Sequence, residues 1–197
     1  MTMTTEAPPR PRQLVNGGDP DAPYFLPLDE LFNGAYFAAS DLDGMATALL
    51  EAYELDLQPH RTFDVAYLWK QKGGTRDGKA VLGKCVLVRG LLAHFCPARF
   101  IIWLAADHLR DAKASRYLVE AILYHEMLHV GEDEDGEPVL IPHEFTGFAA
   151  ELRRYGAYTH DLRVAHQAFE QMPLFELDPL TAARELRVEL DNLTPDA

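Results

Sequence analysis

Residues 115–130, which read SRYLVEAILYHEMLHV, constrain the fold of this chain more than any other stretch. Apolar residues and histidines recur there at spacings of three and four, so that Leu118, Ile122, His125 and His129 fall on one face of a helix. The adjacent face is also apolar, with Val119, Leu123, Met127 and Val130. A helix that is apolar over most of its circumference must be buried. The pattern therefore predicts a central helix, ended by Gly131, around which the rest of the domain packs.

Three segments before this helix have the composition of strands. Residues 62–70 alternate and are rich in aromatic and β-branched side chains, and the turn sequence GGTRDGK separates them from residues 80–90. These two segments predict two strands or a hairpin. The apolar run at 99–107 is typical of a strand buried on at least one face. Together they predict an α+β fold, in which a small, mainly antiparallel sheet packs on the central helix.

The remaining segments predict peripheral elements of one domain. Residues 1–27 are rich in proline and glycine and predict a mobile arm, which leaves residues 28–197 as a single domain with its core at about 62–156. A helix is expected from Ser40 as N-cap. Another is expected with Pro142 near its start and Gly156 at its end, followed by two amphipathic helices, DLRVAHQAFEQM and DPLTAARELRVELDNL.

Composition excludes several classes of function. With 18 basic against 31 acidic residues, the formal charge of −13 would repel a phosphate backbone, so nucleic acid is not expected as a partner. No apolar run approaches the length of about 20 residues that a membrane-spanning helix needs, and no apolar signal-peptide core is present at the start. Cys85 and Cys96 are too few for a disulfide framework and are expected to be free thiols. A cytoplasmic location is therefore expected.

The sequence HEMLH, residues 125–129, is an H-E-x-x-H motif on the predicted helix. The four-residue spacing places the imidazoles of His125 and His129 on one face, where they can bind one Zn²⁺. Glu126 then lies about 100° around the helix, within reach of a water molecule activated by the metal. The alternative is two ordinary core histidines, but burying two imidazoles one turn apart is costly without a shared ligand.

A catalytic zinc site usually has three protein ligands and one water molecule, so a third donor is required. His143 is the first candidate, since 13 residues separate it from His129 and a loop of that length can turn the chain back. If His143 is the N-cap of the next helix, its side chain is free to point toward the metal. Glu144 and Glu151 are the other candidates for the third ligand.

Other polar residues near the motif have simpler interpretations. The acidic residues of 132–137 lack the ligand spacing of an EF-hand loop, which favours a solvated turn over a calcium site. Tyr155 and Tyr158 follow the predicted second helix. Either can donate a hydrogen bond to a developing oxyanion, although packing is the more usual role of a tyrosine.

The run LYHEMLHV followed by PHEFTGFAAELRRYG resembles the phage metallopeptidase family, which is related to the SprT-like zinc peptidases. The resemblance covers about residues 62–156, and its matching positions are Leu82, Gly83, the strand at 100–105, the H-E-x-x-H motif, the acidic loop, His143, Glu144, Phe148 and 153–156. It implies a zincin-like fold with His125, His129 and His143 as zinc ligands and Glu126 as catalytic base. It also implies that the strand at 100–105 is an edge strand that aligns a peptide substrate.

These observations lead to a first hypothesis of a zinc-dependent metallopeptidase that hydrolyses peptide bonds, with a protein or peptide as substrate. The family implies a phage or prophage origin and hence the cytoplasm of a bacterial host. SprT-like members often carry a cysteine zinc ribbon, which this chain lacks, so DNA-bound substrates are not expected. The alternative is a non-catalytic, zinc-stabilised phage protein-binding module whose site is closed by a fourth ligand such as Glu144. A metal-free helical adaptor is a weaker third hypothesis.

Overall fold

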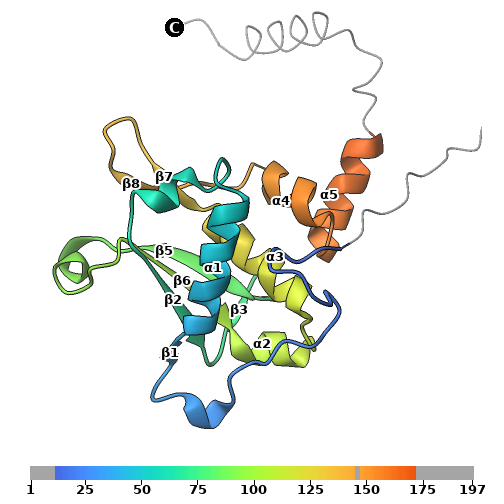
Figure 1. The fold of residues 1–197 in the computed structure, drawn as a ribbon, viewed down its shortest axis with the longest axis horizontal. Helices are drawn as coiled ribbons and strands as arrows, with labels where there is room; N and C mark the ends of the chain where they lie inside the picture. The colour runs from blue at the N-terminus through green and yellow to red at the C-terminus, as the bar shows by residue number, and fades with distance from the viewer. Residues whose placement is uncertain (1–11, 145–146, 172–197) are drawn as a thin grey trace, which may run out of the picture. The chain divides into compact units, whose positions relative to one another are not determined.

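The structure is a computed structural model that describes residues 12–144 and 147–171. The chain divides into two compact units, residues 1–158 and residues 159–197, and each is considered by itself. The first unit contains the sheet and most of the helices (Figure 1). In the second unit the described residues form one helix, α5 (His160–Gln171), which confirms the first of the two predicted amphipathic helices. The segment DPLTAARELRVELDNL lies outside the described residues.

A four-stranded sheet forms the centre of the first unit, with the strand order β1-β2-β6-β5. Its strands are β1 (Tyr36–Ala38), β2 (Val65–Lys70), β5 (Gly83–Leu87) and β6 (Phe100–Ala105). β1 pairs with β2 and β5 pairs with β6 in antiparallel orientation, whereas β2 and β6 are parallel. The predicted α+β fold with a small, mainly antiparallel sheet is therefore confirmed.

The strand at 100–105 is central and not an edge strand, so that expectation was wrong. β6 pairs on both sides, and five of its six residues are buried. Burial on both faces is what its continuous apolar run signals. β6 also separates β2 from β5, so residues 62–70 and 80–90 do not form a hairpin with each other. The turn sequence between them forms a separate small hairpin of β3 (Thr75–Arg76) and β4 (Lys79–Ala80). The edge strands are β1 and β5.

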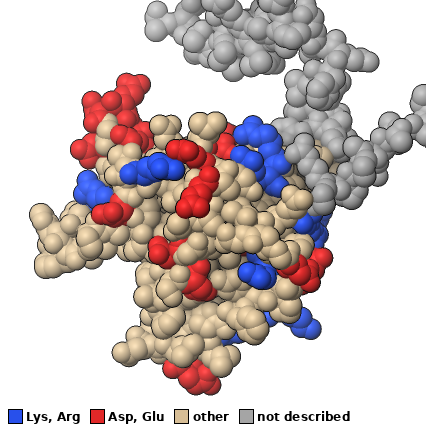
Figure 2. Space-filling model, in the orientation of Figure 1, with Lys and Arg blue, Asp and Glu red and all other residues tan. Residues whose placement is uncertain are grey.

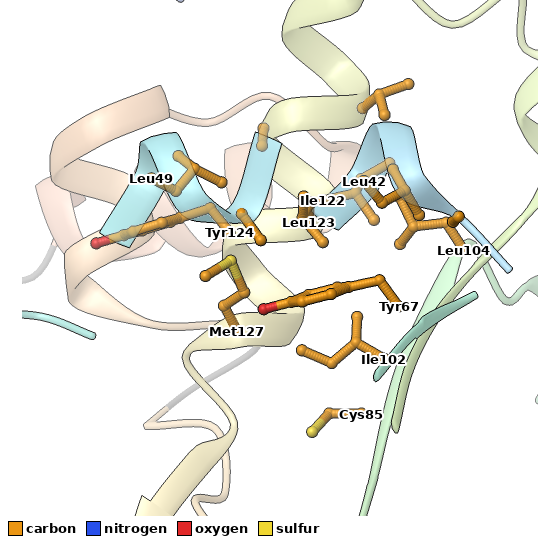
Figure 3. Close-up of a cluster of buried hydrophobic side chains, with 14 of the residues drawn as sticks. Leu42, Leu49, Tyr67, Cys85, Ile102, Leu104, Ile122, Leu123, Tyr124 and Met127 are labelled. Atoms are coloured by element: carbon orange, nitrogen blue, oxygen red, sulfur yellow. The ribbon is translucent and has the colours of Figure 1, made fainter. Parts of the chain in front are cut away.

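Two helices pack against this sheet and against each other (Figure 1). They are α1 (Ser40–Ala52), which contacts β2, and α3 (Arg116–Met127), which contacts β5 and β6. A short helix, α2 (Ala106–Asp111), directly follows β6. Their apolar side chains meet those of the sheet in one core, where Leu42 and Leu49 from α1 lie near Leu123 and Met127 from α3 (Figure 3). The predicted central position of the H-E-x-x-H helix is thereby confirmed.

The start and end of α3 have specific causes. At the start, the Ser115 hydroxyl accepts a hydrogen bond from the backbone N–H of Leu118 at 3.3 Å, as an N-cap does. The helix ends at Met127, so Gly131 is not its terminating glycine; it lies in β7 (Val130–Glu132), which pairs with β8 (Pro138–Leu140). A Cβ on Gly131 would lie 2.6 Å from Cγ1 of Ile141, so close packing requires glycine here.

His60 anchors the C-terminal end of α3. It lies in η2 (Gln58–Arg61), is 7% exposed, and its Nε2 lies 2.8 Å from the carbonyl oxygen of Met127. Because a carbonyl only accepts, Nε2 carries the proton, and Nδ1 has no hydrogen-bond partner in the described part of the chain. Burial lowers the pKa of His60 to about 4, although the bond to Met127 opposes this shift.

The neutral state of His60 makes folding stability depend on pH. Since the folded pKa is about 4 and the unfolded value is 6.5, the unfolded chain binds the extra proton first as the pH falls. Stability from this group is complete above pH 6.5 and is lost toward pH 4, by about 3 kcal/mol. In His60→Gln the side-chain amide can still donate to Met127 but does not titrate. We expect the unfolding free energies of chelator-treated wild type and variant to diverge between pH 7 and pH 4; parallel curves would contradict this.

The described part of the predicted N-terminal arm, residues 12–27, lies against α3. Leu14 is buried in the main core, and the backbone N–H of Val15 donates to the Glu120 carboxylate at 3.2 Å. The backbone N–H of Tyr24 donates to the carbonyl oxygen of Ala114 at 3.1 Å. For these residues the expectation of an arm detached from the core was wrong, because one leucine and a few backbone hydrogen bonds are enough to attach a proline-rich segment. Residues 1–11 lie outside the described part.

The helix predicted from Pro142 starts seven residues later. α4 (Ala149–Tyr155) begins after Phe148, so the described residues before it are not helical and His143 is not an N-cap. The predicted end is confirmed: Gly156 has a φ of 64°, and its N–H donates to the carbonyl oxygen of Leu152 at 3.0 Å. None of the helices in residues 12–144 and 147–171 has the length and hydropathy needed to span a membrane.

Candidate metal centre

Three histidines converge at the C-terminal end of α3. His125 lies in its last turn, His129 lies just beyond, and the β7–β8 hairpin brings His143 back to them. The ring centroids of His125 and His143 are 4.8 Å apart, and those of His129 and His143 are 4.6 Å apart. One ring nitrogen from each of the three lies within 4.8 Å of the other two. The structure thus brings together all three histidines that the sequence selected as ligands.

Hydrogen bonds at Nδ1 orient two of these imidazoles. Nδ1 of His125 contacts the Glu151 carboxylate, and Nδ1 of His129 lies 2.6 Å from the carbonyl oxygen of Ile141. Both partners are acceptors, so Nδ1 carries the proton and the lone pair of Nε2 is available to a metal. Nε2 of His143 lies 3.0 Å from Nε2 of His125. Two nitrogens bound to one tetrahedral zinc lie about 3.3 Å apart, so this pair has nearly the spacing that the ion requires.

The ring of Phe148 forms an apolar wall against all three imidazoles. Its centroid lies 5.5 Å from that of His125, 4.9 Å from that of His129 and 5.2 Å from that of His143, and the side chain is 4% exposed. An apolar neighbour of this size excludes water from one side of the cluster and restricts the rings. Phe148 is also one of the positions on which the sequence resemblance rests.

The pKa shifts of two of the three histidines favour metal binding. Burial lowers the pKa of His129 to about 4, against the effect of its hydrogen bond to Ile141. Burial and the neighbouring His125 also lower the pKa of His143. The pKa of His125 is raised, because the hydrogen bond to Glu151 and nearby carboxylates outweigh the opposing effect of burial. Metal ligation requires neutral imidazoles, which His129 and His143 supply at neutral pH.

Glu126 points toward the edge strand β5. Its side chain is 6% exposed, and its carboxylate accepts a hydrogen bond from the backbone N–H of Cys85. Burial raises the pKa of Glu126 to about 7, although His125 and the Cys85 N–H act in the opposite direction. The side chain approaches Gly83 closely: an added Cβ there would lie 2.9 Å from Oε1 of Glu126 and 2.8 Å from Cδ2 of Leu104, so both side chains would have to shift.

The two alternative third ligands have other partners. One Glu144 oxygen accepts from the backbone N–H of Ala149 at 2.8 Å, at the start of α4. Glu151 is fully buried and contacts Nδ1 of His125, which lies on the opposite side of the ring from Nε2. Within residues 12–144 and 147–171, the group of three or more potential ligands consists of His125, His129 and His143.

The two tyrosines considered for an oxyanion are turned into the protein interior. The Tyr155 hydroxyl donates to Glu120 at 3.0 Å, and Tyr155 is 5% exposed. The Tyr158 hydroxyl lies 3.4 Å from the carbonyl oxygen of Ala121 and 3.5 Å from Oε2 of Glu151. These contacts favour the packing role that the sequence also suggested.

The acidic loop is the solvent-exposed turn between β7 and β8. Oδ1 of Asp133 accepts from the backbone N–H of Asp135 at 3.0 Å and from that of Glu137 at 2.8 Å, so this carboxylate stabilises the turn itself. Figure 2 shows acidic side chains gathered where this hairpin projects, and basic and acidic side chains interspersed elsewhere on the same face. The turn thus has the character of the solvated loop expected from its sequence.

Residues 34–170 match the model of a family described as "Putative phage metallopeptidase". Because the match spans well over half of the chain, the protein belongs to this family. No curated protein and no solved structure matches the chain. The family name gives the class of protein, a phage-associated metallopeptidase, which implies a metal ion and a protein or peptide substrate.

Proposed function

We propose that the protein is a zinc-dependent metallopeptidase that hydrolyses peptide bonds, with Glu126 as general base. The observation that carries this proposal is the convergence of His125, His129 and His143, with the Glu126 carboxylate supplied by the same helix. Three imidazoles suit zinc better than calcium or magnesium, which prefer oxygen ligands. The free thiols of Cys85 and Cys96 support a reducing compartment, such as the cytoplasm of a bacterial host.

In this proposal the three histidines would hold the ion through Nε2. When bound, zinc supplies Lewis-acid chemistry, polarising a carbonyl group and lowering the pKa of a coordinated water molecule. Glu126 takes a proton from the attacking water and later gives it to the leaving amine. A carboxyl group with a pKa of about 7 can do both near neutral pH. The Cys85 N–H holds the carboxylate in place.

The alternative of a non-catalytic, zinc-stabilised binding module requires a fourth protein ligand that closes the site. Glu144 was the candidate for that ligand. Its hydrogen bond to the Ala149 N–H gives it a role at the start of α4 instead. This contact supports a site with three protein ligands and hence the enzyme.

The proposal is tested by assaying the purified full-length chain for cleavage of an unfolded protein such as reduced casein. We expect cleavage that stops after treatment with a chelator and returns when zinc is added back. Cleavage that persists after the metal has been removed would contradict the proposal. Zinc binding without cleavage of casein or of a broad peptide library would favour the binding module.

The contact between Gly83 and Glu126 gives a further prediction. In Gly83→Ala the new methyl group meets Oε1 of Glu126 and Cδ2 of Leu104 at under 3 Å, so the carboxyl group must shift. A misplacement of about 1 Å can lower a rate about 100-fold, so we expect kcat to fall by about that factor while zinc remains bound. The matched control is Gly44→Ala in α1, where nothing lies within 4 Å of the new methyl group. Equal kcat values for the two variants would contradict the role of this contact.

A further inference from the structure

Glu151 is a buried carboxylate with several donors directed at it. Its side chain is fully buried, Oε2 contacts Nδ1 of His125, and Oε1 accepts from the backbone N–H of Phe148 at 3.3 Å. An ionised group at this depth is costly unless it is hydrogen-bonded and paired. Its position behind the His125 ring, away from Nε2, means that it contacts a candidate ligand without being one.

The helix that carries Glu151 is fixed against α3. The Tyr117 hydroxyl of α3 donates to the carbonyl oxygen of Tyr155 in α4 at 2.7 Å, and the rings of these two residues have centroids 5.4 Å apart. Tyr155 also packs on Tyr124 at 5.4 Å between centroids. Glu151 is therefore held in a rigid position relative to His125, as a group that orients a ligand must be.

We propose that Glu151 is the positioning residue of the metal centre, which fixes the His125 ring and keeps its proton on Nδ1 so that Nε2 faces the metal. The inference rests on the proposed metal site and adds a second-sphere residue to it. His129 is oriented in the same way by the backbone carbonyl of Ile141, which no side-chain substitution removes. Of these two Nδ1 acceptors, Glu151 is therefore the one that a substitution can remove.

Glu151→Gln is the most informative substitution. The wild-type carboxylate offers two acceptor oxygens, one to Phe148 N–H and one to His125 Nδ1–H. Glutamine has one acceptor oxygen, so when it serves Phe148 its NH₂ group faces His125. His125 must then accept at Nδ1 and carry its proton on Nε2, the nitrogen needed for the metal. Loss of a second-sphere partner typically weakens metal binding about 10- to 100-fold.

The matched control is Glu120→Gln. Glu120 is also a buried carboxylate of this core, 3% exposed, and it accepts from Val15 N–H and the Tyr155 hydroxyl. This substitution changes a buried carboxylate in the same way, but the hydrogen bonds of Glu120 described above involve none of the three histidines. A purely structural role of Glu151 would make the two variants alike.

The experiment measures the Kd for Zn²⁺ by competition with a chromogenic chelator, for full-length wild type and both variants, and the state of the His125 nitrogens in zinc-loaded wild type by ¹⁵N NMR. We expect Kd to rise about 10- to 100-fold in Glu151→Gln and less than about twofold in Glu120→Gln. In wild type we expect Nδ1 of His125 to be protonated and Nε2 to be bound to zinc.

The outcomes distinguish a failure of the proposed metal centre from a failure of the positioning role of Glu151. Wild type that binds no zinc overturns the metal centre and the positioning role together. Wild type that binds zinc, with an unchanged Kd in Glu151→Gln, overturns the positioning role alone. If Glu151→Gln fails to fold, the wild-type NMR spectrum decides, because zinc bound at Nδ1 of His125 leaves no place for the hydrogen bond to Glu151.

Discussion

Replacing Glu126 by glutamine is expected to lower peptide hydrolysis by about 10³-fold, because the variant has no group at this position that can take a proton from water. Zinc binding should be unchanged, since Glu126 is not one of the three convergent donors. The glutamine oxygen can still accept from the Cys85 N–H. Folding should be retained, because burial already favours the neutral form of this side chain, whose pKa is about 7.

The measurement is the initial rate of cleavage of a fluorogenic peptide, with zinc content and melting temperature determined on the same preparations. Glu144→Gln is a suitable control, because it changes an exposed carboxylate next to the site that has a different hydrogen-bond partner. Activity of Glu126→Gln within a few-fold of wild type, at full zinc occupancy, would remove Glu126 from the role of base.

Replacing His143 by alanine is expected to weaken zinc binding by more than the factor of about 10 to 100 that loss of a second-sphere partner causes. His143 is an exposed side chain, so its removal should leave the core intact. Its Nε2 lies 3.0 Å from that of His125, and no other residue supplies a donor at this position in the three-residue group. The variant should therefore remain folded and bind zinc weakly.

Glu144→Ala, measured beside it, should keep the wild-type Kd for zinc. It should lose about 1 kcal/mol of stability, because its carboxylate no longer accepts from the Ala149 N–H at the start of α4. Loss of zinc from Glu144→Ala with retention in His143→Ala would make Glu144 the third ligand. Loss in both variants would indicate a closed site and favour the binding module.

The three histidines could be selected from the sequence because their chemistry is local. The spacing of His125 and His129 was chosen from helix geometry, although α3 ends at Met127 and His129 lies just beyond it. His143 was chosen by residue type and loop length. The further suggestion that His143 is the N-cap of the next helix was wrong, since α4 begins at Ala149. Its placement comes instead from the β7–β8 hairpin, which returns the chain to the end of α3.

The sheet order could not be predicted from the strand patterns. A continuous apolar run such as 100–105 fits a strand buried on both faces, but it does not show which neighbours the strand has. The sheet order instead makes β1 and β5 the edge strands, and the Cys85 N–H of β5 contacts Glu126.

The residues that support the site are scattered in the sequence, and no local pattern identifies them. Glu151 lies 26 positions after His125, and Gly83 lies 43 positions before Glu126. Their contacts arise only from tertiary packing. Of these residues, only Gly83 could have been singled out in advance, because it belongs to the Leu-Gly pair on which the sequence resemblance rests.

A crystal structure of the zinc-loaded, full-length chain tests the central claim most directly. We expect one zinc ion bound by Nε2 of His125, His129 and His143, at about 2.0–2.1 Å from each nitrogen, with no fourth protein ligand. A site that stays empty at saturating zinc, an ion held by other residues, or a fourth ligand from the protein would contradict the proposed catalytic centre.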